Sequence, residues 1–186
     1  MKRLLDLLLC LALLPVLVLP CAVLFVLVRL TSRGPALYWS DRVGQHNHIF
    51  RMPKFRSMRI DTPAVATHLL QDPASYLTPM GSFLRKSSLD ELPQLWCILK
   101  GEMSFVGPRP ALFNQHDLIQ ARTDCNVHLI KPGLTGWAQV NGRDEIPIPQ
   151  KVALDLEYAK RQSIWFDIQI LFLTFLKVVR TEGVSH

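Results

Sequence analysis

Two adjacent carboxylates, Asp90 and Glu91, stand shortly after a pair of cations within the stretch Arg85–Trp96. A carboxylate can attack phosphorus or hold a divalent metal, and nearby positive charge neutralises phosphate oxygens. A second basic element follows, with Arg109 between two prolines. These residue types in this order indicate phosphate chemistry, with Asp90 and Glu91 as candidate catalytic and metal-binding residues.

The same carboxylates have a purely structural explanation. Ser88-Leu89-Asp90-Glu91 fits a capping box, in which Ser88 caps the Glu91 amide and Glu91 reaches back. Acidic residues also favour a helix start for electrostatic reasons. Pro93 fits a helix better if Asp90 is the cap, because the proline then lies in the first turn. The residues alone leave both explanations open.

The candidates for binding substrate phosphate are Lys54, Arg56, Arg85, Arg109 and Arg143. Lys54 and Arg56, together with Arg59, alternate on an expected strand and should share a face, whereas the other three candidates lie beside turns or prolines. A diphosphate in low-dielectric surroundings requires two or three such groups. The alternative is a solvated basic face that touches anionic lipid. Because the set flanks an acidic pair, it favours substrate phosphate.

Composition narrows the partners without choosing among them. The chain has 186 residues, with 21 Lys and Arg against 15 Asp and Glu, so its formal net charge is +6. This balance favours nucleic acid, acidic lipid or a phosphorylated substrate. The sequence contains no zinc-ligand spacing, no Gly-x-x-x-x-Gly-Lys loop and no dinucleotide fingerprint. The length suits one globular unit plus at most one membrane element.

An apolar segment opens the chain. Residues 7–28 contain no charged side chain, and a helix of that length reaches roughly 33 Å, enough to cross a bilayer core. A cleaved signal peptide is disfavoured, because a proline precedes Cys21 and the apolar run continues to Val28. A single span and a re-entrant hairpin both remain open. The hairpin predicts cations at both ends, as seen, and a helix break, for which Pro15 and Pro20 are candidates.

The elements expected after the apolar segment are mainly helical. A small β-hairpin is expected within residues 31–60, with its turn at Gly44. Residues 61–80 suit a surface excursion and 131–143 a turn-rich segment. The other elements expected are helices from Leu89 to just before Gly101, over 110–121, over 150–161 and over 164–179, the last packed or interfacial. We therefore predict an α/β, mainly helical fold, with a membrane segment over 1–30 and a catalytic domain over 31–186.

A series of ordered motifs runs almost end to end: Lys2-Arg3-Leu4-Leu5-Asp6, Asp41-Arg42-Val43-Gly44, Lys54-Phe55-Arg56-Ser57-Met58, Ser88-Leu89-Asp90-Glu91-Leu92-Pro93-Gln94-Leu95, Leu99-Lys100-Gly101-Glu102-Met103-Ser104, Val106-Gly107-Pro108-Arg109-Pro110, Lys131-Pro132-Gly133-Leu134-Thr135-Gly136, Gln139-Val140-Asn141-Gly142-Arg143 and Leu154-Asp155-Leu156-Glu157-Tyr158. With them the chain resembles the bacterial sugar transferase family, the small monotopic phosphoglycosyl transferases that start glycan assembly on undecaprenyl phosphate.

The resemblance implies a reaction and roles for residues. A UDP-sugar and polyprenyl phosphate would give polyprenyl-diphosphate-sugar and UMP. Asp90 would attack the sugar-bound phosphate and form a covalent phosphosugar intermediate, which the lipid phosphate resolves in ping-pong fashion. Glu91 would act with a Mg²⁺ cofactor and in positioning. Lys54, Arg85 and Arg109 match basic residues that line the family site.

The resemblance also implies a location: the cytoplasmic face of a bacterial inner membrane, with a re-entrant helix broken at a proline. The family usually has Ser-Pro at the break, where this chain offers Leu19-Pro20. The expected partners are a UDP-sugar, undecaprenyl phosphate and inner-membrane lipid, without nucleic acid, and a homo-oligomer stays open. The alternative from another class is a membrane-tethered basic module that binds lipid headgroups or a partner protein without catalysis.

Overall fold

Helices dominate the computed structural model, which describes residues 1–63, 65, 72–142 and 146–180. The helices are α1 (Lys2–Thr31), α2 (Gly81–Ser87), α3 (Leu95–Lys100), α4 (His116–Asp124), α5 (Trp137–Asn141), α6 (Ile148–Arg161) and α7 (Ile164–Arg180). The strands are β1 (Leu37–Val43), β2 (Ile49–Phe55), β3 (Ser104–Val106) and β4 (Gly133–Thr135). The mainly helical fold with a small hairpin is confirmed.

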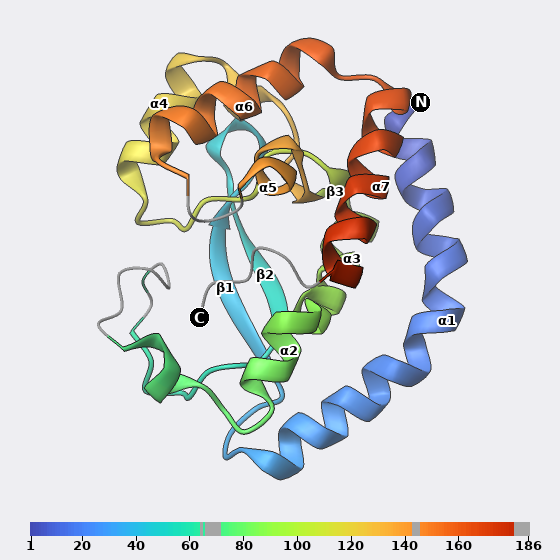
Figure 1. Cartoon of the computed structure of the whole chain (residues 1–186), viewed down its shortest axis with the longest axis vertical. Coiled ribbons are helices and arrows are strands. Elements are labelled where there is room, and N and C mark those ends of the chain that lie inside the picture. Colours follow the sequence, from blue (N-terminus) through green and yellow to red (C-terminus); the bar gives the residue numbers. More distant parts are fainter. Residues whose placement is uncertain (64, 66–71, 143–145, 181–186) are drawn as a thin grey trace.

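The apolar segment forms α1, one uninterrupted helix of 30 residues that contains both Pro15 and Pro20. The helix bends near its middle and runs along one side of the molecule (Figure 1). A proline inside a helix removes one backbone hydrogen bond and clashes with the preceding turn, which bends the helix. The predicted helix break is thus a bend in a continuous helix, and not a gap between two helices.

The start of α1 is fastened to the globular part by polar contacts. Lys2 forms an ion pair with Asp167 of α7 at 2.5 Å. Arg3 donates to two backbone carbonyls at the end of α3, one of them at 2.7 Å. The buried carboxylate of Asp6 accepts a hydrogen bond from the Ser104 hydroxyl at 3.0 Å. These contacts explain the charged residues in the first motif of the chain.

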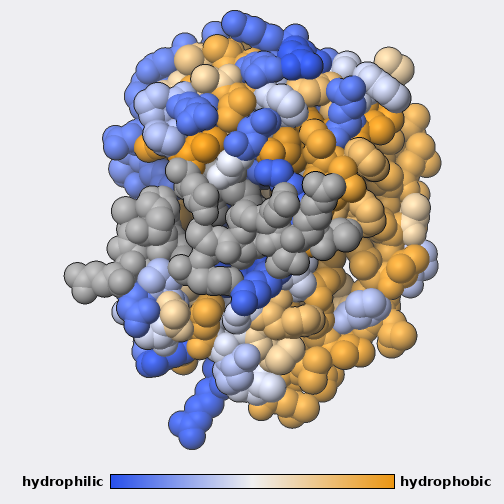
Figure 2. Space-filling model, viewed as in Figure 1, coloured by the Kyte–Doolittle hydropathy of each residue, from blue (hydrophilic) through white to orange (hydrophobic). Residues whose placement is uncertain are grey.

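The far end of α1 packs on the same globular part. Leu24 and Val28 are buried in a cluster with Phe55 of β2 and Leu84 of α2. Most of the remaining apolar side chains of α1 are exposed, and they form a continuous hydrophobic band on that side of the molecule (Figure 2). Both ends of α1 therefore contact one globular body, while its middle presents apolar surface outward.

The central β-hairpin is the predicted one. β1 and β2 pair antiparallel from Leu37 opposite Phe55 to Val43 opposite Ile49, with Gly44 in the connection. β2 contributes apolar side chains to the main core, which it shares with α3, β3, α5, α6, α7 and the first half of α1. The hairpin thus forms the support against which the segment with the carboxylates packs.

Other elements differ from the sequence prediction. β3 and β4 form a short parallel pair that was not predicted, because three-residue strands carry too little alternation to recognise. The helix expected from Pro110 begins at His116, since the backbone of Ala111 and Leu112 pairs with the end of β1 instead. α3 ends before Gly101 as predicted, and Gly101 adopts a φ of 85° that favours glycine.

Candidate active site

The two carboxylates lie in a short 3-10 helix, Leu89–Gln94, that joins α2 to α3. Ser88 precedes it in the left-handed conformation, with a φ of 57°, and makes no side-chain capping bond to it. The Glu91 carboxylate is turned toward cations on other elements, as described below. The capping-box explanation is therefore wrong. Neighbouring side chains of a 3-10 helix point about 120° apart. Asp90 and Glu91 nevertheless share surroundings, because the charges of Lys54 and Arg109 act on both carboxyl groups.

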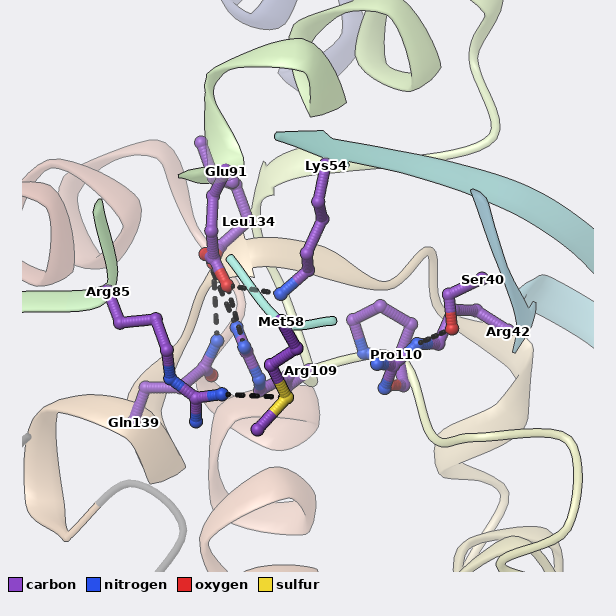
Figure 3. Close-up of polar contacts among 10 residues, drawn as sticks. All are labelled: Ser40, Arg42, Lys54, Met58, Arg85, Glu91, Arg109, Pro110, Leu134 and Gln139. Atoms are coloured by element: carbon purple, nitrogen blue, oxygen red, sulfur yellow. Dashed lines mark hydrogen bonds and ion pairs between the residues drawn. The ribbon is translucent and has the colours of Figure 1, made fainter. Parts of the chain in front are cut away.

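Glu91 is the centre of a cluster of ion pairs (Figure 3). Lys54 of β2 lies 2.8 Å from Glu91 Oε1, and Arg109 lies 2.7 Å from the same oxygen and 3.4 Å from Oε2. Burial by itself would raise the pKa of Glu91, but the charges and hydrogen bonds of Arg109 and Lys54 outweigh it and hold that pKa far below its usual range. Glu91 is therefore a fixed anion.

Asp90 has the opposite character. Its side chain is buried, and within the described part of the chain no hydrogen bond or ion pair engages its carboxylate. Burial raises the pKa of Asp90 and the charge of Glu91 adds to the rise, while Lys54 and Arg109 act against it. Its carboxylate is thus poorly solvated and not committed to a partner, as a nucleophile requires.

Arg109 is positioned by close backbone packing. A Cβ on Gly107 would lie 2.4 Å from the Lys131 carbonyl oxygen, and one on Gly133 would lie 2.1 Å from the Gly107 nitrogen, so only glycine allows this approach. Behind the loop, Arg122 donates to the Arg109 carbonyl at 2.8 Å. The packing fixes the backbone from which Arg109 reaches Glu91.

Two positioning residues were missed in the sequence. Arg122 is itself held by Asp155 of α6 at 2.7 Å, and both side chains are buried. The only sequence signal was Asp155 within a motif shared with the family. A buried Arg–Asp pair with this contact fixes the Arg109 loop and leaves neither charge uncompensated.

The structure brings together three of the five predicted phosphate ligands. Lys54 and Arg109 contact Glu91, with Arg85 beside them (Figure 3), and the charges of all three act on Asp90. Arg85, on α2, lies 3.4 Å from the sulfur of Met58, and its charge lowers the pKa of Asp90. Arg143 lies outside the described residues.

Arg56 does not join them. Its side chain is 4 % exposed and donates to the carbonyl and hydroxyl of Ser32, at 3.1 and 2.8 Å, and to the Arg33 carbonyl. Arg56 follows the last residue of β2, so its alternation with Lys54 does not continue on the strand. It holds the backbone at the end of α1, and its guanidinium is directed away from the acidic pair.

We expect Arg56→Met to lower stability and to leave substrate binding unchanged. Loss of the guanidinium removes charge-assisted hydrogen bonds from the partly buried carbonyls of Ser32 and Arg33, at a cost of about 1–3 kcal/mol. Thermal unfolding of the detergent-purified protein should shift down by a few degrees, with an unaltered KM for the nucleotide donor. Arg59→Met is the matched control, because Arg59 is exposed and paired with Asp61. A raised KM in Arg56→Met alone would return Arg56 to the site.

The two carboxylates are also the candidate ligands for a metal ion. Among the residues that the structure describes, no group of three or more His, Cys, Asp or Glu side chains converges. Magnesium needs no such cage, since one or two carboxylates with substrate phosphate oxygens and water complete its octahedron. Glu91 Oε2, whose contact with Arg109 is 3.4 Å, is the less engaged oxygen of that residue. The donor set therefore fits magnesium carried with a diphosphate.

A cavity of about 240 Å³ opens beside Glu91 and Arg109. Apolar side chains make up most of the rest of its lining, among them Leu13 and Leu17 of α1 and Leu171 of α7, and Lys86 and Lys177 add further positive charge. The site thus joins a charged end, suited to phosphate, to an apolar end bordered by the helix with the exposed hydrophobic band.

Known proteins resemble this chain over most of its length. The profile of the family described as bacterial sugar transferase matches residues 1–181. The UDP-glucose:undecaprenyl-phosphate glucose-1-phosphate transferase of Xanthomonas campestris is 42% identical over 82% of this chain and 33% of its own length. The undecaprenyl-phosphate galactose phosphotransferase of Salmonella typhimurium is 41% identical over 81% of this chain and 34% of its own length.

A shorter relative matches over most of both chains. The uncharacterised sugar transferase EpsL of Bacillus subtilis is 41% identical over 86% of this chain and 77% of its own length. Against the two longer relatives above, this chain spans about a third of their length. The match over residues 1–181 includes the carboxylate pair and the three cations around it. The chain belongs to the bacterial sugar transferase family.

Proposed function

We propose that this chain is a phosphoglycosyl transferase, which moves a sugar-1-phosphate from a UDP-sugar to undecaprenyl phosphate and releases UMP. The observation that carries the proposal is the contrast within the carboxylate pair: Asp90 is buried and unengaged, while Glu91 is fixed between Lys54 and Arg109. The names of the two longer relatives, a glucose-1-phosphate transferase and a galactose phosphotransferase, both specify undecaprenyl phosphate. This reaction would be the first membrane step in assembling an O-antigen, capsule, exopolysaccharide or glycoprotein glycan.

In the proposed mechanism a carboxylate oxygen of Asp90 attacks the phosphorus that bears the sugar. The bond from that phosphorus to the oxygen bridging the two phosphates breaks, and UMP leaves with the electron pair. An oxygen of the lipid phosphate then attacks the same phosphorus, and the bond to Asp90 breaks. The products are polyprenyl-diphosphate-sugar and free Asp90 carboxylate, so the enzyme is regenerated.

The cations supply the charge that the reaction needs. Lys54 and Arg109 already face the acidic pair, and Arg85 adds a third positive charge near Asp90. Because these groups are fixed in a partly buried site, they stabilise charge on the transferred phosphoryl group with little rearrangement. Glu91, with Asp90 as a second carboxylate, would hold magnesium, which would supply positive charge to the leaving phosphate.

We propose that α1 enters and leaves the membrane on one side. Support comes from the contacts at its two ends: Lys2 and Asp6 at the start, and Leu24 and Val28 near the end, bind the same globular body. A helix that crossed the bilayer would place one of these ends on the far side. We further propose that the catalytic body lies at the cytoplasmic face of the inner membrane, where UDP-sugars are made.

The test is the nucleotide released by the full chain. Purified protein is given magnesium, undecaprenyl phosphate and, in turn, UDP-glucose, UDP-galactose and UDP-N-acetylated sugars. The proposal predicts UMP as the product with at least one donor, dependent on the lipid for continued turnover. Release of UDP would mean glycosyl transfer and would overturn the mechanism. No nucleotide release with any donor would favour the non-catalytic membrane module.

A further inference from the structure

The apolar cavity beside the acidic pair has a wall that the chemistry of the dyad does not explain. Leu13 and Leu17 of α1 form one side, and Leu171 and Val178 of α7 the other. α1 and α7 lie side by side along this part of the molecule (Figure 1). Leu17 and Leu171 are partly buried against the main core, so the two walls are fixed in place.

The charged end of the same cavity carries excess positive charge. Among the residues that the structure describes, Lys86 of α2, Arg109 and Lys177 of α7 line it, with Glu91 as the one carboxylate. A phosphate monoester brings about −1.5 to −2 charges and would complement this lining. A nucleotide-sugar, by contrast, has no apolar part that would fill the leucine walls.

Building on the proposed function, we propose that this groove between α1 and α7 is the subsite for the acceptor lipid. The head-proximal isoprene units lie between the leucines of α1 and α7, and the lipid phosphate lies between Lys177, Lys86 and Arg109. From there it faces the phosphorus on Asp90 after UMP has left. A cavity of about 240 Å³ is far smaller than an undecaprenyl chain, so the remainder of the chain lies in the bilayer.

The placement of the groove explains how a lipid could reach a polar site. One wall belongs to α1, whose other face bears exposed apolar side chains such as Val16 and Leu19. A lipid that moves in the bilayer along α1 thus meets the groove without passing through water, which makes transfer of its apolar chain inexpensive. The phosphate needs to travel only from the interface to the cations.

The two half-reactions separate this proposal from the proposed function. Exchange of labelled UMP into UDP-sugar requires the donor and Asp90 but no lipid, whereas full turnover requires the groove. In the variants Leu17→Trp and Leu171→Trp, the larger side chain occupies the space between the two walls of the groove. We expect the KM for undecaprenyl phosphate to rise at least about tenfold, with UMP exchange within about twofold of wild type. The two variants should show the same rise in KM when the acceptor has only two or three isoprene units, because these units are the ones placed in the groove.

Matched controls lie outside the groove on the same helices. Leu19→Trp and Phe172→Trp change exposed side chains, at 72% and 61% exposure, and should leave the acceptor KM unchanged. Lys177→Gln tests the charged end without altering the packed walls, with exposed Lys160→Gln as its control. We expect Lys177→Gln to raise the acceptor KM several-fold and to spare exchange.

Different results would contradict the groove proposal and the covalent mechanism. If the tryptophan variants keep exchange but bind the lipid as the controls do, the groove is not the acceptor subsite. If they lose exchange as well, Lys177→Gln decides, and an unaltered acceptor KM in that variant refutes the proposal. Absence of exchange in the wild-type protein would instead overturn the covalent mechanism, whatever the groove does.

Discussion

Asp90→Asn is expected to lose turnover by a factor on the order of 10⁴ or more while remaining folded. The amide is nearly the same size as the carboxylate but cannot attack phosphorus, so both half-reactions stop. Intact-protein mass after incubation with UDP-sugar, without acceptor, should show a sugar-phosphate adduct on the wild-type chain and none on Asp90→Asn. Residual turnover near the wild-type rate would rule out Asp90 as the nucleophile.

Stability should separate the two carboxylates. Burial raises the pKa of Asp90, which means that its charge is disfavoured in the folded protein, so Asp90→Asn should unfold at the same temperature as wild type or higher. Glu91→Gln is the comparison, because it leaves Lys54 and Arg109 without their shared anion and should unfold at a lower temperature. Equal destabilisation by both changes would mean that Asp90 has a structural partner.

The sequence was most informative where a pattern was long or a residue type was constrained. Gly44 and Gly101 marked the hairpin turn and the end of α3. The charged helical segment over 150–161 and the apolar segment over 164–179 correctly predicted α6 and α7. The acidic pair was identified from residue types, although two explanations were open. The capping box is excluded, and Glu91 instead contacts Lys54, 37 positions away in sequence; such a contact leaves no local pattern.

The misassignment of Arg56 has the same cause. Lys54 and Arg56 are two positions apart, and on a continuous strand their side chains would lie on one face, but β2 ends at Phe55. One residue past the strand, the backbone turns and the guanidinium reaches the end of α1. Likewise, the short strands β3 and β4 are specified by close glycine contacts between distant loops, which periodicity does not record.

Lys54→Met should slow catalysis and move its pH dependence in a defined direction. Asp90 must be ionised to attack, so activity falls as the pH drops through its pKa, which burial has raised above the ordinary value of about 3.9. Among the charges around Asp90, Lys54 does most to oppose that rise. Methionine fills a similar volume without the charge, so the pKa of the carboxylate pair rises further.

We therefore expect kcat/KM of Lys54→Met to fall on the order of 10²–10³-fold at neutral pH, with its acid limb at higher pH than in wild type. Lys54→Arg keeps the charge, so its acid limb should stay near that of wild type even if its larger side chain lowers kcat. Exposed Lys160→Met on α6 controls for loss of one positive charge from the chain. If the acid limb of Lys54→Met lay at the same pH as that of wild type, the limb would report a group other than the carboxylate pair. The charge of Lys54 would then have no effect on the ionisation that limits activity.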